Sequence, residues 1–153
     1  MKKLLFIFTL IALVLAACAA GVASGSQTEI GKNREKWQNV DISHYRYNLF
    51  ISCFCVFNED MPLIIEVQDG EVVSMEFQSG KEIDPGLHET FDKYATIDRF
   101  FTELESDING AADVVTAKYD ETYGFPTEVT IDFVQEATDD ELYLTLSNFE
   151  ALP

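Results

Sequence analysis

The stretch that decides the fold is residues 44–57, which read HYRYNLFISCFCVF. The apolar face of this stretch carries Tyr45, Tyr47, Leu49, Ile51, Cys53, Cys55 and Phe57. Three more apolar residues, Phe50, Phe54 and Val56, interrupt the polar face. An apolar side chain at every second position is typical of a β-strand with one buried face. We therefore predict one long strand, with both cysteines near its C-terminal end on the apolar side.

A hairpin is expected after this strand, because the pair Asp69-Gly70 separates two apolar runs. A three-residue turn at 68–70 places Ile65 opposite Val73 and keeps the apolar side chains on one face. We predict that register, because the buried face decides how the two strands pair.

Two helices are expected. The longer one begins at Thr96, whose hydroxyl can cap the first turn, and ends at Asn109-Gly110. Its apolar stripe consists of Ile97, Phe100, Phe101, Leu104 and Ile108, which recur at helical spacing. The shorter helix is predicted over residues 34–39, where Trp37, the single tryptophan, is expected to anchor packing.

Three more strands are predicted over residues 113–119, 127–134 and 141–149 from their alternating apolar residues. The predicted order is then helix, three strands, helix, three strands. This order favours the α+β class, with a mainly antiparallel sheet of about six strands covered by one long and one short helix. It also permits a duplicated αβββ-αβββ arrangement.

The chain opens with the basic residues Lys2 and Lys3, followed by an apolar run over residues 4–15 that is short for a membrane span. The next residues, Leu15-Ala16-Ala17-Cys18, resemble the lipobox of bacterial lipoproteins. The resemblance implies cleavage before Cys18 and attachment of a diacylglyceryl group to its thiol. It therefore implies a protein outside the cytoplasm that is anchored to a bacterial membrane, with the choice between inner and outer membrane left open.

The domain boundaries follow from this reading. Residues 1–17 are expected to be a removed signal peptide, and residues 18–33 a lipidated N-terminus and flexible tether. Residues 34–153 are expected to form a single α+β domain. The formal net charge of −17 argues against nucleic acid as a partner.

The domain contains Ser52-Cys53-x-Cys55 and Tyr119-Asp120-x-x-Tyr123-Gly124-Phe125-Pro126. These motifs resemble a family of bacterial secreted and lipid-anchored domains of unknown function, whose pattern combines S-C-x-C with Y-D-x-x-Y-G-Y/F-P. The resemblance covers roughly residues 35–150 and implies a single domain with no assigned activity. It also makes the two cysteines family features. Glu121 departs from the pattern, because the family often has proline there.

The pair Cys53 and Cys55 has four interpretations: a structural disulfide, two reduced core thiols, a redox pair, or part of a metal site. Once Cys18 is lipidated, the two cysteines can pair only with each other or between molecules. An oxidising compartment favours the disulfide. Residues i and i+2 of a strand are roughly 6.6 Å apart, so a disulfide requires a local kink. A metal site would need further ligands, for which His44 and His88 are the available histidines.

The second motif is a candidate binding loop, made of Tyr119, Asp120, Tyr123, Gly124, Phe125 and Pro126. Aromatic residues in a rigid loop are typical of a binding edge. The alternative is a tyrosine-rich connection that packs over the end of the sheet.

The sequence contains no known catalytic motif and suggests no cofactor, so no catalytic residue is predicted. We expect a non-enzymatic binding domain whose partner is an envelope protein or ligand. The alternative is a thiol-disulfide or metal-handling envelope protein that uses the C-x-C pair.

Overall fold

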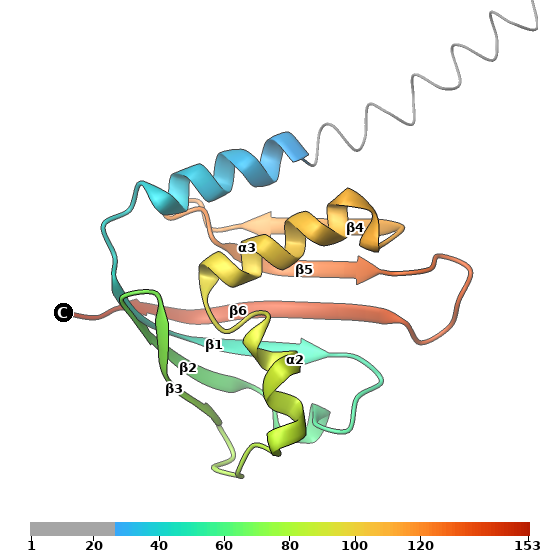
Figure 1. Ribbon diagram of the computed structural model, residues 1–153, viewed down its shortest axis with the longest axis horizontal. Coiled ribbons are helices and arrows are strands. Elements are labelled where there is room, and N and C mark those ends of the chain that lie inside the picture. The colour runs from blue at the N-terminus through green and yellow to red at the C-terminus, as the bar shows by residue number, and fades with distance from the viewer. Residues whose placement is uncertain (1–26) are drawn as a thin grey trace, which may run out of the picture.

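The computed structural model describes residues 27–153, and its centre is one antiparallel sheet of six strands (Figure 1). The strands are β1 (His44–Ser52), β2 (Leu63–Gln68), β3 (Glu71–Phe77), β4 (Val114–Tyr119), β5 (Pro126–Asp132) and β6 (Glu141–Ala151). Their order across the sheet is β3-β2-β1-β6-β5-β4. The predicted α+β class is therefore confirmed. The predicted signal peptide and Cys18 lie outside the described residues.

The central strands are β1 and β6, the first and last of the sheet in chain order. The predicted alternation in β1 is confirmed, because Tyr45, Tyr47, Leu49 and Ile51 are each no more than 3% exposed. The element order also matches two αβββ halves. A two-fold axis would pair equivalent strands of the two halves, whereas β1 pairs with β6. The halves are therefore not related by such an axis.

The β2–β3 hairpin differs from the prediction. Its turn has two residues, Asp69 and Gly70, with φ angles of 53° and 80°, as in a type I′ turn. Ile65 pairs with Met75 instead of Val73. The apolar side chains still share one face, because the extra residue is accommodated as a bulge within β3 instead of in the turn.

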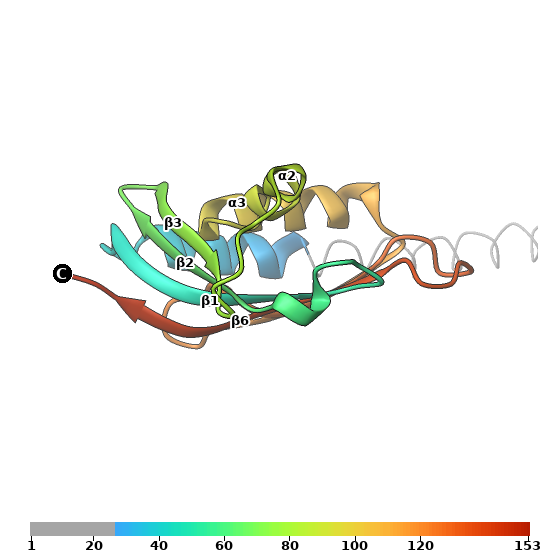
Figure 2. The same ribbon diagram turned by 90° about the horizontal axis from the view of Figure 1, so that it is seen from below.

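The α-helices of residues 27–153 lie on one face of the sheet (Figure 2). They are α2 (His88–Asp92), α3 (Ile97–Ser106) and an N-terminal helix over residues 27–38. The start of α3 is as predicted, since the Thr96 hydroxyl accepts a hydrogen bond from the Arg99 amide at 3.1 Å. After α3, a short π-helical turn ends where Gly110 adopts a φ of 117°. Among residues 27–153, no helix has the length and apolar character needed to span a membrane.

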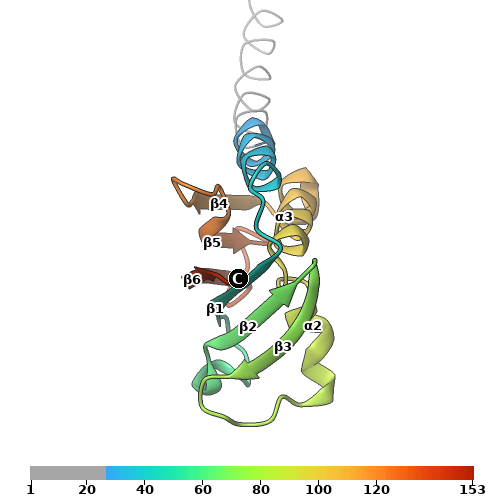
Figure 3. The ribbon, with the colours of Figure 1, turned by 90° about the vertical axis from the view of Figure 1, so that its left-hand side faces the viewer.

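The N-terminal helix is longer than predicted. Residues 27–33, which were expected in the tether, are helical, and Ile30 is only 2% exposed. Ile30 and Trp37 are seven residues apart, so two helical turns place them on the same face. The helix lies beside α3 (Figure 3), where Arg34 forms an ion pair with Glu105 at 2.5 Å.

Trp37 anchors this helix to the sheet, as predicted for the single tryptophan. Its ring makes edge-on contacts with Tyr45, Phe149 and Phe125, at centroid distances of 5.4, 6.0 and 6.2 Å. Edge-to-face pairs of this kind contribute energy beyond the area they bury. The N-terminal helix is therefore part of the folded domain.

Candidate functional site

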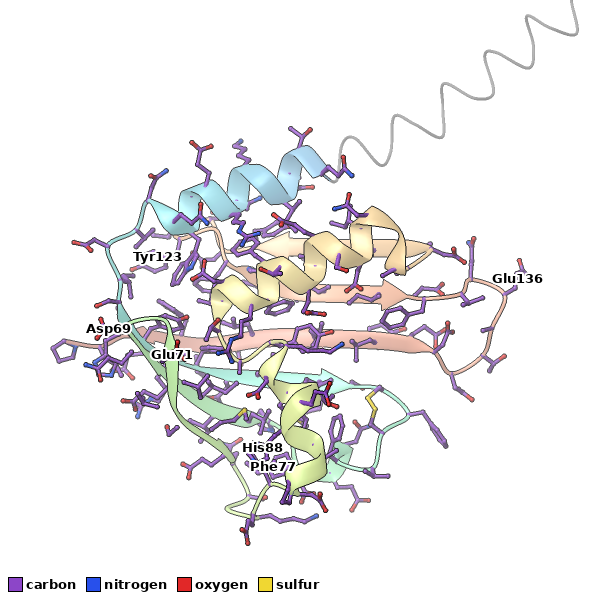
Figure 4. The ribbon with its side chains drawn as sticks, in the orientation of Figure 1. Asp69, Glu71, Phe77, His88, Tyr123 and Glu136 are labelled. Atoms are coloured by element: carbon purple, nitrogen blue, oxygen red, sulfur yellow. A yellow bond between two sulfur atoms is a disulfide. The ribbon has the colours of Figure 1, made fainter. Side chains whose placement is uncertain are left out.

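The chain leaves the sheet at Ser52, five residues earlier than predicted, and turns back over residues 53–57. The turn brings the Cα atoms of Cys53 and Cys55 to 5.1 Å, and their sulfur atoms lie at disulfide distance. Figure 4 shows this bond in yellow. The Asn58 side chain donates to the Cys53 carbonyl and closes the turn. The kink that a disulfide between neighbouring strand positions requires is therefore present.

The same turn exposes two large apolar side chains. Phe54 and Val56 are each 91% exposed, although both follow directly on a buried strand. Phe57 returns to the core, where its ring contacts Phe91 at a centroid distance of 4.9 Å. Of the three apolar residues that interrupt the alternation, Phe54 and Val56 are the most exposed large hydrophobic residues among those the structure describes, whereas Phe50 is 40% exposed.

A hollow of about 300 Å³ lies beside the disulfide. Three segments line it: the end of β1 with its turn, the end of α2, and the loop between β5 and β6. The lining residues are Ile51, Cys53, Phe54, Cys55, Phe57, Thr90, Lys93, Tyr94, Phe133, Asp139, Asp140, Glu141 and Leu142. The inner surface is apolar because Ile51, Phe57 and Tyr94 belong to the buried core.

Carboxylates dominate the charged part of this lining. The charged lining residues are three carboxylates, from Asp139, Asp140 and Glu141, and a single cation, Lys93. None of these three carboxylates forms an ion pair within residues 27–153. Desolvation, together with the charges of Asp140, Glu141 and Asp113, raises the pKa of the neighbouring Asp132. The rim of the hollow therefore has a negative potential.

The predicted binding loop lies at the opposite end of the sheet. Figure 4 shows Tyr123 at one end, and the disulfide with Glu136 of the β5–β6 loop at the other. The Asp120 carboxylate accepts hydrogen bonds from the Thr122 and Tyr123 amides at 2.9 and 2.7 Å, which fixes the turn. The structure therefore does not bring the two sequence motifs together.

Most of this loop packs against the domain itself. Phe125 is 3% exposed, Gly124 and Pro126 are buried, and Tyr119, Asp120 and Tyr123 are half-buried. The Phe125 and Phe149 rings are 4.7 Å apart, and Lys36 of the N-terminal helix donates to the Glu121 carbonyl. Burial leaves Phe125 unable to contact a partner. The geometry supports the alternative reading of a connection that packs over the sheet end.

His44, one of the two histidines considered as further metal ligands, does not lie beside the cysteines. His44 begins β1, whereas the cysteines follow its end, and the His44 ring contacts Glu66 at 2.9 Å and the Pro153 carbonyl at 3.1 Å. Within residues 27–153, no group of three or more histidine, cysteine, aspartate or glutamate side chains is arranged to hold a metal ion.

The sequence favours the disulfide, but it does not reveal which residues line the hollow beside it. Lys93 is distant from the cysteines in the chain, and its presence beside them depends on how α2 packs. The acidic residues 139–141 stand next to each other in the chain, a pattern typical of a solvated turn. The available signal was the pair Phe54 and Val56, whose apolar side chains break the strand pattern next to the cysteines.

These features define an α+β domain with helices on one face of an antiparallel sheet and a disulfide-lined hollow at one end. The chain belongs to DUF6174, a family of unknown function, whose family model matches residues 29–151. The match confirms the predicted membership of an uncharacterised domain family and includes most of the N-terminal helix. No curated protein and no solved structure matches the chain.

Proposed function

We propose that this protein is a lipid-anchored binding domain outside the cytoplasm, and that it binds its partner at the disulfide end of the sheet. One observation carries the choice of site: Phe54, which lines the apolar hollow, and Val56, two residues further along the same turn, are each 91% exposed. Burying such a side chain contributes about 1.5–3 kcal/mol, so two of them supply a substantial part of a binding free energy. Exposed apolar clusters of this kind are typical of interaction sites.

The anchor rests on the sequence around Cys18. A basic start, an apolar run and Leu-Ala-Ala-Cys occur in the order that bacterial lipoproteins require. Two or three acyl chains, at about 0.8 kcal/mol for each buried methylene, hold a protein stably on a membrane. Replacing Cys18 with serine should therefore abolish palmitate labelling and release the protein from the membrane fraction. Retention of labelled C18S protein on membranes would contradict the anchor.

The binding site is tested by placing a photo-crosslinking amino acid at position 54 or 56 of the full chain in its native membrane. We expect a discrete adduct from both positions, because both side chains project from the turn. The matched control is position 73, where Val73 is 52% exposed on the edge strand β3. The Phe54→Ser/Val56→Ser variant should bind the crosslinked component at least tenfold more weakly, since it loses two apolar contacts. An equal adduct from position 73 would refute the site.

A thiol-disulfide carrier is the second candidate, favoured by Lys93 beside the half-buried cysteine pair. A nearby cation stabilises a thiolate and so makes it the stronger nucleophile. In such a reaction a partner dithiol is oxidised to its disulfide while the Cys53–Cys55 disulfide is reduced to two thiols.

The carrier is tested by equilibrating the protein with glutathione buffers and counting thiols by intact mass. Known thiol-disulfide exchange proteins have reduction potentials of about −120 to −270 mV, whereas structural disulfides typically lie below about −300 mV. We expect instead that the pair stays oxidised in mild reductant, because the binding proposal requires the disulfide to hold the turn fixed. Full reduction within that range would favour the carrier.

A further inference from the structure

The hollow beside the disulfide has the size of a site for a short segment. Ligand pockets commonly measure about 300–1,000 Å³, and this one lies at the lower limit, at about 300 Å³. Its inner surface is formed by Ile51, Phe57 and Tyr94, so a ligand must offer an apolar group to fill it. A bulky or fully polar ligand fits this space poorly.

Apolar side chains continue outward from the hollow to its edge. Phe54 lines the hollow and is largely exposed, and Val134, in the loop opposite, is 53% exposed. An apolar ligand side chain that enters the hollow would be covered by the Phe54 ring. A recognition element of one or two apolar side chains matches this arrangement.

The charges that line the hollow determine which charged groups a ligand should carry. Three carboxylates and one ammonium group line the hollow, and Lys93 already has the Glu103 carboxylate at 3.8 Å. One buried oxygen of Asp140 has no hydrogen-bond partner within the described residues. Like charges held close together repel, so a cation placed there relieves repulsion and supplies missing donors. The net charge of −17 attracts such a ligand from a distance.

We infer that the site binds a cationic amphipathic peptide segment, with an apolar side chain in the hollow and lysine or arginine residues on Asp139, Asp140 and Glu141. This inference rests on the proposed function, because it names the partner class for the same site. Anionic lipid headgroups and nucleic acids carry the wrong charge for this rim. Electrostatic complementarity of this kind sets specificity and association rate.

The test uses the full lipidated chain in nanodiscs of zwitterionic phosphatidylcholine, with empty nanodiscs as the blank. The probe is an acetylated octapeptide that alternates lysine with leucine and phenylalanine. Two matched peptides replace lysine by glutamate, or the apolar residues by serine. We expect saturable binding of the probe alone, measured by calorimetry, and weaker binding at high salt, because salt screens exposed charges.

The key variant is Asp139→Asn/Asp140→Asn/Glu141→Gln. Asparagine retains the shape and acceptor oxygen of aspartate, which matters because Asp140 accepts the Val134 amide at 2.7 Å. Loss of three ion pairs should weaken probe binding about tenfold or more and reduce its salt dependence. The control variant, Glu35→Gln/Asp41→Gln/Glu76→Gln, removes three exposed charges from outside the hollow and should leave most of the affinity.

The outcomes separate this inference from the proposed function. Probe binding that the hollow variant does not weaken, or stronger binding of the glutamate peptide, overturns the cationic ligand. Absence of probe binding, with crosslinking at position 54 intact, also overturns the ligand class and leaves the proposed site standing. If Phe54→Ser/Val56→Ser affects neither probe nor crosslinked component, the site itself is wrong. Circular dichroism of each variant establishes that the fold is retained.

Discussion

Replacing Trp37 with alanine should lower the free energy of unfolding by about 3–5 kcal/mol, the range for large aromatic truncations in a core. Trp37 is 5% exposed and contacts the rings of Tyr45, Phe125 and Phe149. Its removal leaves a cavity between the N-terminal helix and the sheet. We expect the helix over residues 27–38 to undock before the rest of the domain unfolds.

The measurement is urea unfolding followed by circular dichroism, because the variant lacks the single tryptophan that fluorescence would require. Trp37→Phe is the matched control, since it keeps an aromatic ring and should lose less than half as much stability. A loss below about 0.5 kcal/mol for the alanine variant would show that Trp37 does not anchor the helix, because surface substitutions have effects of that size.

Replacing Gly124 with alanine should destabilise the domain by about 3 kcal/mol through overpacking and backbone strain. Gly124 has a φ of 85°, a region that residues with a Cβ atom rarely adopt. An added Cβ atom would lie 2.6 Å from the Asn33 carbonyl oxygen and 3.0 Å from the Lys36 Cβ atom. The backbone of the N-terminal helix would therefore have to move away from the loop.

The Gly80→Ala variant separates backbone strain from overpacking. Gly80 has a similar φ of 76°, but an added Cβ atom there would meet nothing within 4 Å. We expect its loss to be about 1 kcal/mol, the conformational cost alone. The difference between the two variants measures the contact between the loop and the helix. Equal losses would show that the helix does not pack closely on Gly124.

The parts of the fold that could be predicted are those with a local periodic pattern. The alternation in β1 and the apolar stripe of α3 each bury one face, so the sequence reports which side points inward. The first part of the N-terminal helix, residues 27–33, was not predicted, because the buried face of the helix offers only Ile30 and Trp37, with Gly31 between them. Its stability comes from packing on residues far along the chain, such as Phe125 and Phe149.

The site was less predictable, because most of its residues come from segments that are far apart in the chain. Its disulfide lies within one segment, and the expected oxidising compartment, with only two cysteines left after Cys18, was enough to favour it over the other interpretations. The hollow needs three segments, and nothing local relates Lys93 or Asp139 to Cys53. For the loop ending at Pro126, the sequence offered two readings. Which one holds depends on the N-terminal helix, which covers the aromatic residues.

The start of the N-terminal helix also limits how far the domain can lie from Cys18. Folded structure is present from Gln27, so only nine peptide units separate it from Cys18. Even fully extended, nine residues span at most about 30 Å. On a lipidated chain, the domain would therefore work in a thin layer next to the bilayer. Partners in the same membrane would meet it by diffusion in two dimensions, at a high effective concentration. Modest affinity at the disulfide end would then suffice for capture.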